Sequence, residues 1–338
     1  MALVVEGRIG LDDPVGPFLR RWQFPTTAPF TGLVTLRGLL SHTAGLPSAS
    51  SAVYREPNDV PSLVDVVSGR AGSPAAVPGR WPGEAFRYSN PGYGLVQLLV
   101  EDISEMPFSD WANTRVLQPL EMTSSGFVAP AAADANRAAP HRRSGSRMPD
   151  GFFNQQAAGG LVTTVDDLGR LCTAMIATGT AGRDGGVLPA SAIEEMWICP
   201  PAGVGAFRLR NGGYGLGQVS GALPSGTPFI ANQGSRPGWR SLLICLPDRR
   251  CAVAIATNAN SGLPLLVHLG GRWLRRAAGE RLPGVRLSLS RHAERRPGAG
   301  CPRVAVPNFT AAAGSPYTET PEWRDRWPIV QARSRRPI

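Results

Sequence analysis

The chain has 338 residues, 42% of them hydrophobic and 18% charged, a composition typical of a globular protein large enough to bury a sizeable core. Its formal net charge is +10, and all 35 basic residues are arginine, because the sequence contains no lysine. An arginine side chain does not give up its proton in a protein. The composition therefore excludes mechanisms in which a lysine of this chain binds phosphate in a P-loop, forms a Schiff base or acts as a general base.

The positive charge is concentrated at the C-terminal end. Residues 281–338 hold 11 arginines against 4 acidic residues, a net charge of +7, whereas residues 1–280 carry only +3. The segment is rich in Arg and Pro and has no hydrophobic periodicity, which predicts a disordered, solvated tail. The alternative is a tail that binds nucleic acid or a membrane surface, although few aromatic residues lie between its arginines.

Cysteine and histidine spacing argues against a metal site. The five cysteines stand at positions 172, 199, 245, 251 and 301, and the four histidines at 42, 141, 268 and 292. No CxxC pair and no metal-ligand spacing occurs, so we expect no metal and no cofactor. Cysteines within apolar runs, such as Cys245 between Ile244 and Leu246, are interpreted as small core residues.

No apolar run is long enough to cross a bilayer, and residues 1–7 lack the basic region of a signal peptide. As written, the sequence predicts a cytoplasmic protein. An upstream extension with a signal peptide would make it a secreted, periplasmic or cell-surface protein.

The first part of the chain predicts helices. Residues 1–6 are mostly apolar without a preceding N-cap, and Gly7 is typical of a helix C-cap, so this segment is interpreted as the end of a helix whose beginning is missing. Further helices are expected over residues 35–40, 60–68, 90–104, 108–117 and 164–178, with loops over 71–83 and 129–150. The strongest is 90–104, where Tyr93, Val96, Leu99 and Ile103 recur at helical spacing.

The pattern changes near residue 204. Strands are expected over residues 214–219, 238–246 and 251–257, a hairpin turn over 247–250, and a closing helix over 264–278. This order predicts an α+β fold, in which an antiparallel sheet carries a helical region of about residues 35–180. The sheet and closing helix take up about residues 204–279, and we expect one domain over residues 1–280.

Three common catalytic or nucleotide-binding motifs, GxSxG, HExxH and GxGxxG, are absent. A more informative stretch is Tyr88-Ser89-Asn90. If it is extended, the phenol of Tyr88 and the amide of Asn90 point to the same side. A phenol can move a proton when nearby cations lower its pKa, and an amide can orient a neighbouring group. The alternative is a plain turn in which Asn90 caps the next helix.

Several phrases stand in one order along the chain: residues 3–15 (LVVEGRIGLDDPV), 35–47 (TLRGLLSHTAGLP), 88–90 (YSN), 116–123 (VLQPLEMT), 159–161 (GGL) with 167–168 (DL), and 214–217 (YGLG). Together they resemble the β-lactamase-related serine hydrolases, which include class C β-lactamases, DD-peptidases and esterases. The resemblance covers roughly residues 1 to 280. It implies a β-lactamase/transpeptidase-like fold and acyl transfer to an ester, peptide or β-lactam carbonyl of a small-molecule or peptide substrate.

The resemblance also implies roles for particular residues. Tyr88 would relay a proton and Asn90 would orient its neighbours. Residues 232–239 (NQGSRPGW) match the family's third motif, a Lys-Thr-Gly or His-x-Gly strand that lines the cleft. The backbone N–H of Ser235 would then donate to the oxyanion, and Asn232, Gly234 and Arg236 would bind substrate. His42 belongs to a phrase that is structural in this family.

Two departures from the family are clear. The family's nucleophile and base form a Ser-x-x-Lys pair on one helix face, but no lysine is present, and the matching serine would lie roughly ten residues before Met1, about three helical turns. In the third motif, Asn232 stands where Lys or His is expected, so only Arg236 would offer positive charge to a substrate carboxylate.

Three hypotheses follow. The first is a serine hydrolase read from an internal start, with an upstream Ser-x-x-Lys and missing N-terminal strands. The second is an inactive remnant or ligand-binding pseudoenzyme, which Asn232 and the tail without a core pattern favour. The third and weakest is nucleic-acid binding through the basic tail. As written, the chain is expected to carry out no serine acyl chemistry of the family type.

Overall fold

The computed structural model describes residues 1–49, 51–127, 137–176, 187–206 and 212–279. The predicted tail, residues 281–338, lies outside the described residues, as do part of the predicted loop 129–150 and the end of the predicted helix 164–178. Within the described ranges, no helix is long and apolar enough to cross a membrane.

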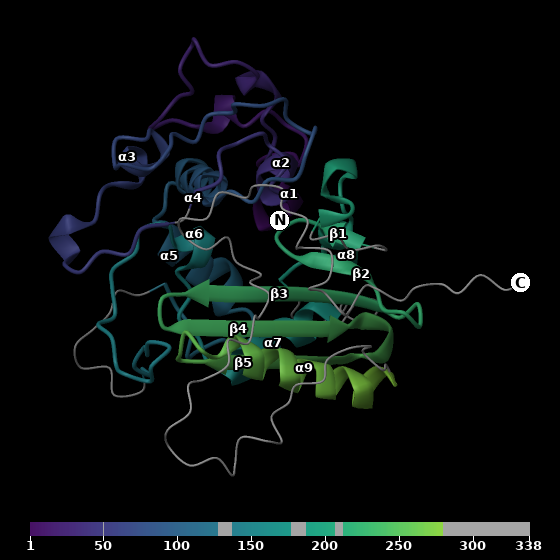
Figure 1. Cartoon of the computed structure of the whole chain (residues 1–338). Coiled ribbons are helices and arrows are strands. Elements are labelled where there is room, and N and C mark those ends of the chain that lie inside the picture. Colours follow the sequence, from purple (N-terminus) through teal and green to yellow (C-terminus); the bar gives the residue numbers. More distant parts are fainter. Residues whose placement is uncertain (50, 128–136, 177–186, 207–211, 280–338) are drawn as a thin grey trace, which may run out of the picture.

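The sheet is a five-stranded antiparallel meander in the order β1-β2-β3-β4-β5 (Figure 1). Its strands are β1 Gly212–Tyr214, β2 Val219–Ala222, β3 Pro228–Arg236, β4 Trp239–Leu246 and β5 Cys251–Thr257. The expected strands over 238–246 and 251–257 are confirmed. A single strand over 214–219 is wrong, because the chain turns between β1 and β2 at Gly217, whose φ of 94° suits glycine.

Helices cover the two faces of the sheet. Helix α9 (Leu263–Ala278) packs Leu274 against Phe229, Ile244 and Leu246. On the other face, α7 (Val165–Ile176) brings Cys172 against Ile230 and Cys245. Since side chains alternate along a strand, the even-numbered residues of β3 lie on the α7 face.

The other helices form a second, helical part above the sheet in Figure 1. They are α1 Ala2–Val5, α2 Leu36–Leu40, α3 Leu63–Val67, α4 Asn90–Ser104, α5 Phe108–Ala112 with a π-helical turn over Asn113–Leu117, α6 Gln156–Gly159 and α8 Ala190–Trp197. Helix α4 has the predicted bounds, and Gly7 follows α1 in the left-handed region (φ 68°), as expected.

Capping decides where two predicted helices begin. The hydroxyl of Thr35 accepts the Gly38 N–H and starts α2. The hydroxyl of Ser62 accepts the Asp65 N–H, so the helix expected over 60–68 starts only at Leu63. Each cap satisfies one of the backbone donors that a helix N-terminus leaves free.

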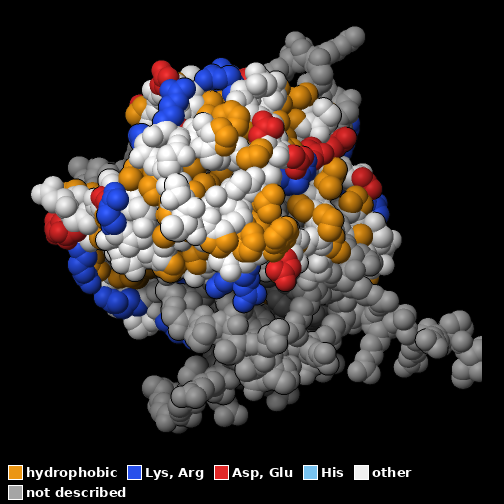
Figure 2. Space-filling view, turned by 90° about the horizontal axis from the view of Figure 1, so that it is seen from above, with side chains coloured by type: hydrophobic (Ala, Val, Ile, Leu, Met, Phe, Trp, Pro, Cys, Tyr) orange, Lys and Arg blue, Asp and Glu red, His pale blue; other side chains and the backbone are white. Residues whose placement is uncertain are grey.

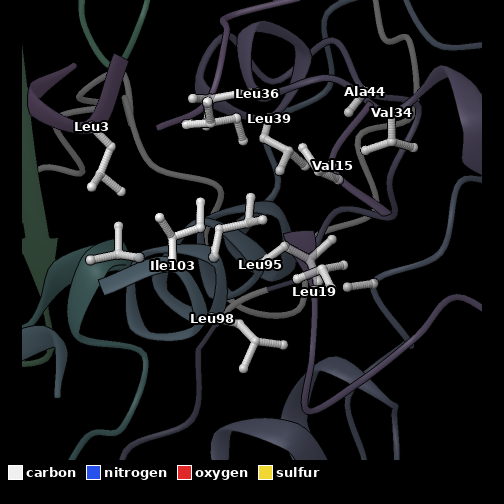
Figure 3. Close-up of a cluster of buried hydrophobic side chains, with 14 of the residues drawn as sticks. Leu3, Val15, Leu19, Val34, Leu36, Leu39, Ala44, Leu95, Leu98 and Ile103 are labelled. Carbon is white, nitrogen blue, oxygen red and sulfur yellow. The ribbon is translucent and has the colours of Figure 1, made fainter. Parts of the chain in front are cut away.

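The core of the helical part surrounds α4. Its apolar residues Leu95, Leu98 and Ile103 belong to one buried cluster with Leu3 of α1 and with residues of the N-terminal loops, among them Val15, Leu19 and Val34 (Figure 3). The N-terminal residues are therefore integral to this core. The surface of the molecule seen from above carries scattered hydrophobic side chains between polar ones, with charged side chains of both signs (Figure 2).

Candidate active site between the helical part and the sheet

The segment Tyr88-Ser89-Asn90 leads directly into α4. Ser89 is extended (φ −139°, ψ 109°), and its Oγ accepts the N–H of Gly92 at 3.1 Å. Because Ser89 is extended, Tyr88 and Asn90 project to the same side of the backbone. This is the arrangement expected for an extended Tyr88-Ser89-Asn90 segment. The alternative that Asn90 caps the helix is wrong, since Ser89 is the cap and Asn90 is the first helical residue.

A buried histidine holds this segment in place. His42 is 3% exposed and adopts a left-handed backbone conformation (φ 58°). Its Nδ1 accepts the N–H of Ser89 at 3.1 Å, so the proton of the neutral ring is on Nε2. Burial lowers the pKa of His42 from 6.5 to about 3, because the charged imidazolium would lose its hydration. The ring is therefore neutral and provides no positive charge to its neighbours.

His42 lies within a cluster of aromatic rings. Its ring centroid is 4.1 Å from that of Tyr88, 5.0 Å from those of Tyr93 and Tyr214, and 6.0 Å from that of Phe86. Sequence reasoning missed this role of His42: it gave the phrase a structural part but did not connect it to Ser89. Only tertiary packing shows the connection, because the two residues are 47 positions apart.

The backbone carbonyl of Leu40 connects the aromatic cluster to the sheet. It accepts the hydroxyl of Tyr93 at 2.9 Å and the N–H of Gly217 at 3.1 Å. Burial raises the pKa of both Tyr93 and Tyr214 well above the usual value for a phenol, so both stay protonated. Gly217 lies between β1 and β2, next to the strand that carries the predicted third motif.

The segment that the resemblance predicts as the third motif begins on β3, where residues 232–236 lie. Asn232 is exposed, and its Nδ2 donates to the carbonyl of Gly217 at 3.0 Å. Gly234 is paired with Ser241 of β4, and a Cβ at Gly234 would overlap the Ser241 hydroxyl. Ser235 is paired with Arg240 and is half-buried. Together with Arg236, Asn232 and Gly234 lie on the α7 face of the strand.

Arg236 reaches from β3 toward α6. Its guanidinium carbon lies 4.5 Å from the ring centroid of Phe153, and its Nη1 donates to the carbonyl of Gly159 at 3.5 Å. Burial lowers the pKa of Arg236, an effect that the nearby charge of Asp150 offsets in part. Within the described ranges, Arg236 forms no ion pair, whereas Asp150 is paired with Arg137 at 2.6 Å. A partly dehydrated guanidinium of this kind suits a carboxylate ligand.

The structure thus brings Tyr88 and Asn232 into one connected network, through the aromatic cluster, Leu40 and Gly217. Asn90 and Ser235 lie on the same elements as this network, at the start of α4 and on β3. In the described ranges, His, Cys, Asp and Glu side chains form no group of three that could hold a metal ion. The arrangement offers amide, phenol and guanidinium donors, each of which can donate to a carbonyl or carboxylate oxygen.

Comparison with known proteins extends these observations. The beta-lactamase family model matches residues 1–275. Protein flp of Staphylococcus aureus (strain N315) is 28% identical over 127 residues, which are 38% of this chain and 25% of that protein. Penicillin-binding protein 4* of Bacillus subtilis (strain 168) is 24% identical over 271 residues, 75% of this chain and 56% of the relative.

Among solved structures, SurE with D-Leu superposes with a TM-score of 0.62 at 27% identity, covering 82% of this chain and 60% of that one. The chain accordingly spans a quarter to three fifths of the length of these relatives. The similarity supports a β-lactamase/transpeptidase-like α+β fold.

Proposed function

The chain belongs to the beta-lactamase family, and on this premise we propose that the junction of the helical part and β3 is the carbonyl-binding half of an acyl-transfer site. In this proposal Tyr88 relays a proton, Asn90 orients neighbouring groups, and the backbone N–H of Ser235 donates to the developing oxyanion. The substrate is an ester, peptide or β-lactam. The observation that carries the proposal is the network from Tyr88 to Asn232, which unites two motifs about 140 residues apart.

The reaction also needs a nucleophile. In a Ser-x-x-Lys pair the lysine removes the serine proton so that the oxygen can attack a carbonyl. These 338 residues contain no lysine, and arginine cannot take that role. We expect this polypeptide to bind a carbonyl ligand without forming an acyl-serine, and turnover to require a Ser-x-x-Lys that these residues do not contain.

A second candidate function, ligand binding without catalysis, is favoured by Asn232. Its amide donates to Gly217 and carries no charge, so the attraction of a substrate carboxylate falls to Arg236. A binding protein needs such recognition but no activated serine. Nucleic-acid binding by the tail concerns residues outside the described part of the chain and gains no support from the fold.

Two experiments separate these functions. The first treats the 338-residue protein with a fluorophosphonate and with a fluorescent penicillin and looks for a covalent adduct by mass spectrometry. We expect no adduct. An adduct on any serine of this chain would contradict the inference that a chain without lysine forms no acyl-serine. The second translates the genomic DNA in frame upstream of Met1. A Ser-x-x-Lys there would allow the extended protein to be made, and its labelling on that serine, with loss of turnover in a Tyr88→Phe variant, would support the hydrolase.

Ligand binding is tested on the same 338-residue protein. An N-acetylated dipeptide with a free carboxylate is titrated by calorimetry against the unmodified chain, Arg236→Gln and Arg249→Gln. Arg249 lies on the exposed β4–β5 turn and is the matched control. We expect binding to weaken at least tenfold for Arg236→Gln alone. Equal affinity in the Arg236→Gln variant would contradict the assigned carboxylate contact.

A further inference from the structure

Two buried cysteines from distant parts of the chain meet under the sheet. Cys172 on α7 is 1% exposed and Cys245 on β4 is 2% exposed. Both belong to one apolar cluster with Ile230. All four cysteines that the structure describes are free thiols.

The packing of α7 on the sheet explains why the two cysteines lie close together. Cys172 lies on the buried stripe of α7, one turn after Leu168 and one turn before Met175 and Ile176. In β4, Cys245 shares a face with Leu243, and the register places it between Ile230 of β3 and Ala252 of β5. The helix therefore presents one sulfur directly to the sheet face that carries the other.

We propose that Cys172 and Cys245 are a redox-active pair, which a peroxide converts into a disulfide that links α7 to β4. The Cys172 thiolate attacks one oxygen of hydrogen peroxide, forming a sulfenic acid and, after protonation, releasing one water. The Cys245 sulfur then attacks the sulfenic sulfur, the S–S bond forms, and the second water leaves. Two thiols lose two protons and two electrons in total, and one peroxide becomes two waters.

The contact gives the two sulfurs different roles. The neighbouring Cys245 thiol lowers the pKa of Cys172, whereas the Cys172 thiol and burial raise the pKa of Cys245. The lower-pKa thiol holds more thiolate, which is the form that reacts with peroxide. Cys172 is thus the attacking residue and Cys245 the resolving one. Their burial restricts the reaction to small oxidants, and the proposal is independent of the function assigned above.

Peptide mapping on the full chain tests this directly. The reduced protein is treated with hydrogen peroxide, unfolded, alkylated with N-ethylmaleimide and digested with trypsin. Cleavage after arginine places Cys172 in the peptide 171–183 and Cys245 in 241–249, whereas Cys199 and Cys251 fall in 184–208 and 251–272. We expect the first two peptides to be recovered as one cross-linked species without N-ethylmaleimide, and the oxidised protein to melt at a higher temperature.

Three controls make the result specific. Cys172→Ala should remove the cross-link and leave Cys245 alkylated, whereas Cys199→Ala should keep it. Oxidation of the urea-unfolded chain should give mixed pairings, because the specificity comes from the fold. Recovery of peptides 171–183 and 241–249 as separately alkylated species after native oxidation, or a preferred link to Cys251, would overturn the proposal. Since the mapping uses the unmodified protein, it decides the matter even where a variant fails to fold.

Discussion

His42 makes the stability of the protein depend on pH between about pH 5 and 7, above the range in which ordinary carboxyl groups titrate. In the unfolded chain its imidazole takes up a proton near pH 6.5, whereas in the fold burial lowers its pKa to about 3. Protons therefore bind the unfolded state preferentially as the pH falls. The contribution of the neutral His42 to the free energy of unfolding is fully present above pH 6.5 and is lost progressively toward pH 3. Between pH 7 and pH 5 this one group should cost about 2 kcal/mol of unfolding free energy.

The matched variant is His42→Asn. Asparagine tolerates the left-handed backbone conformation of residue 42, and its Oδ1 can accept the Ser89 N–H in place of Nδ1. The variant loses ring packing, so its stability falls at every pH, but it has no group to titrate between pH 5 and 7. Urea unfolding at both pH values measures the difference.

The unmodified protein and a His268→Asn control, which keeps His42, should lose about 2 kcal/mol more between pH 7 and pH 5 than His42→Asn does. An equal loss in all three proteins would refute the assignment of a neutral, buried imidazole.

Two further predictions concern packing and charge in the described structure. Gly234→Ala should lower the unfolding free energy by about 1 kcal/mol, because its methyl group forces the Ser241 hydroxyl into another rotamer. In a Ser241→Gly background, urea titration should show most of this loss recovered, and no recovery would contradict the overlap. Asp102 accepts the Arg20 N–H at 2.7 Å and the Nε of Arg21 at 2.5 Å. Asp102→Asn should therefore cost about 2 kcal/mol, whereas Glu105→Gln, which breaks only an exposed pair with Arg20, should change the melting point little.

Local signals in the sequence were sufficient to predict the bounds of several elements. Helix α4 has the predicted bounds because its cap, its early proline and its apolar spacing all lie within one segment. Strand β5 also has its predicted bounds, since Cys251–Thr257 is a β-branched and apolar run after a turn. The order of the expected helices and strands predicted the α+β class, and the family phrases implied the β-lactamase/transpeptidase-like fold. The absence of lysine, a property of composition alone, determined which catalytic chemistry this chain lacks.

Other features are visible only in the tertiary structure. Strands β1 and β2 are three and four residues long and rich in glycine, so pairing with neighbours, rather than residue preference, makes them strands. Helix α8 was not predicted. The bond between His42 and Ser89 and the contact between Cys172 and Cys245 join residues that no local pattern connects. Sequence periodicity reports which face of an element is buried, but which side chains meet across the core is decided only when helices and strands pack together.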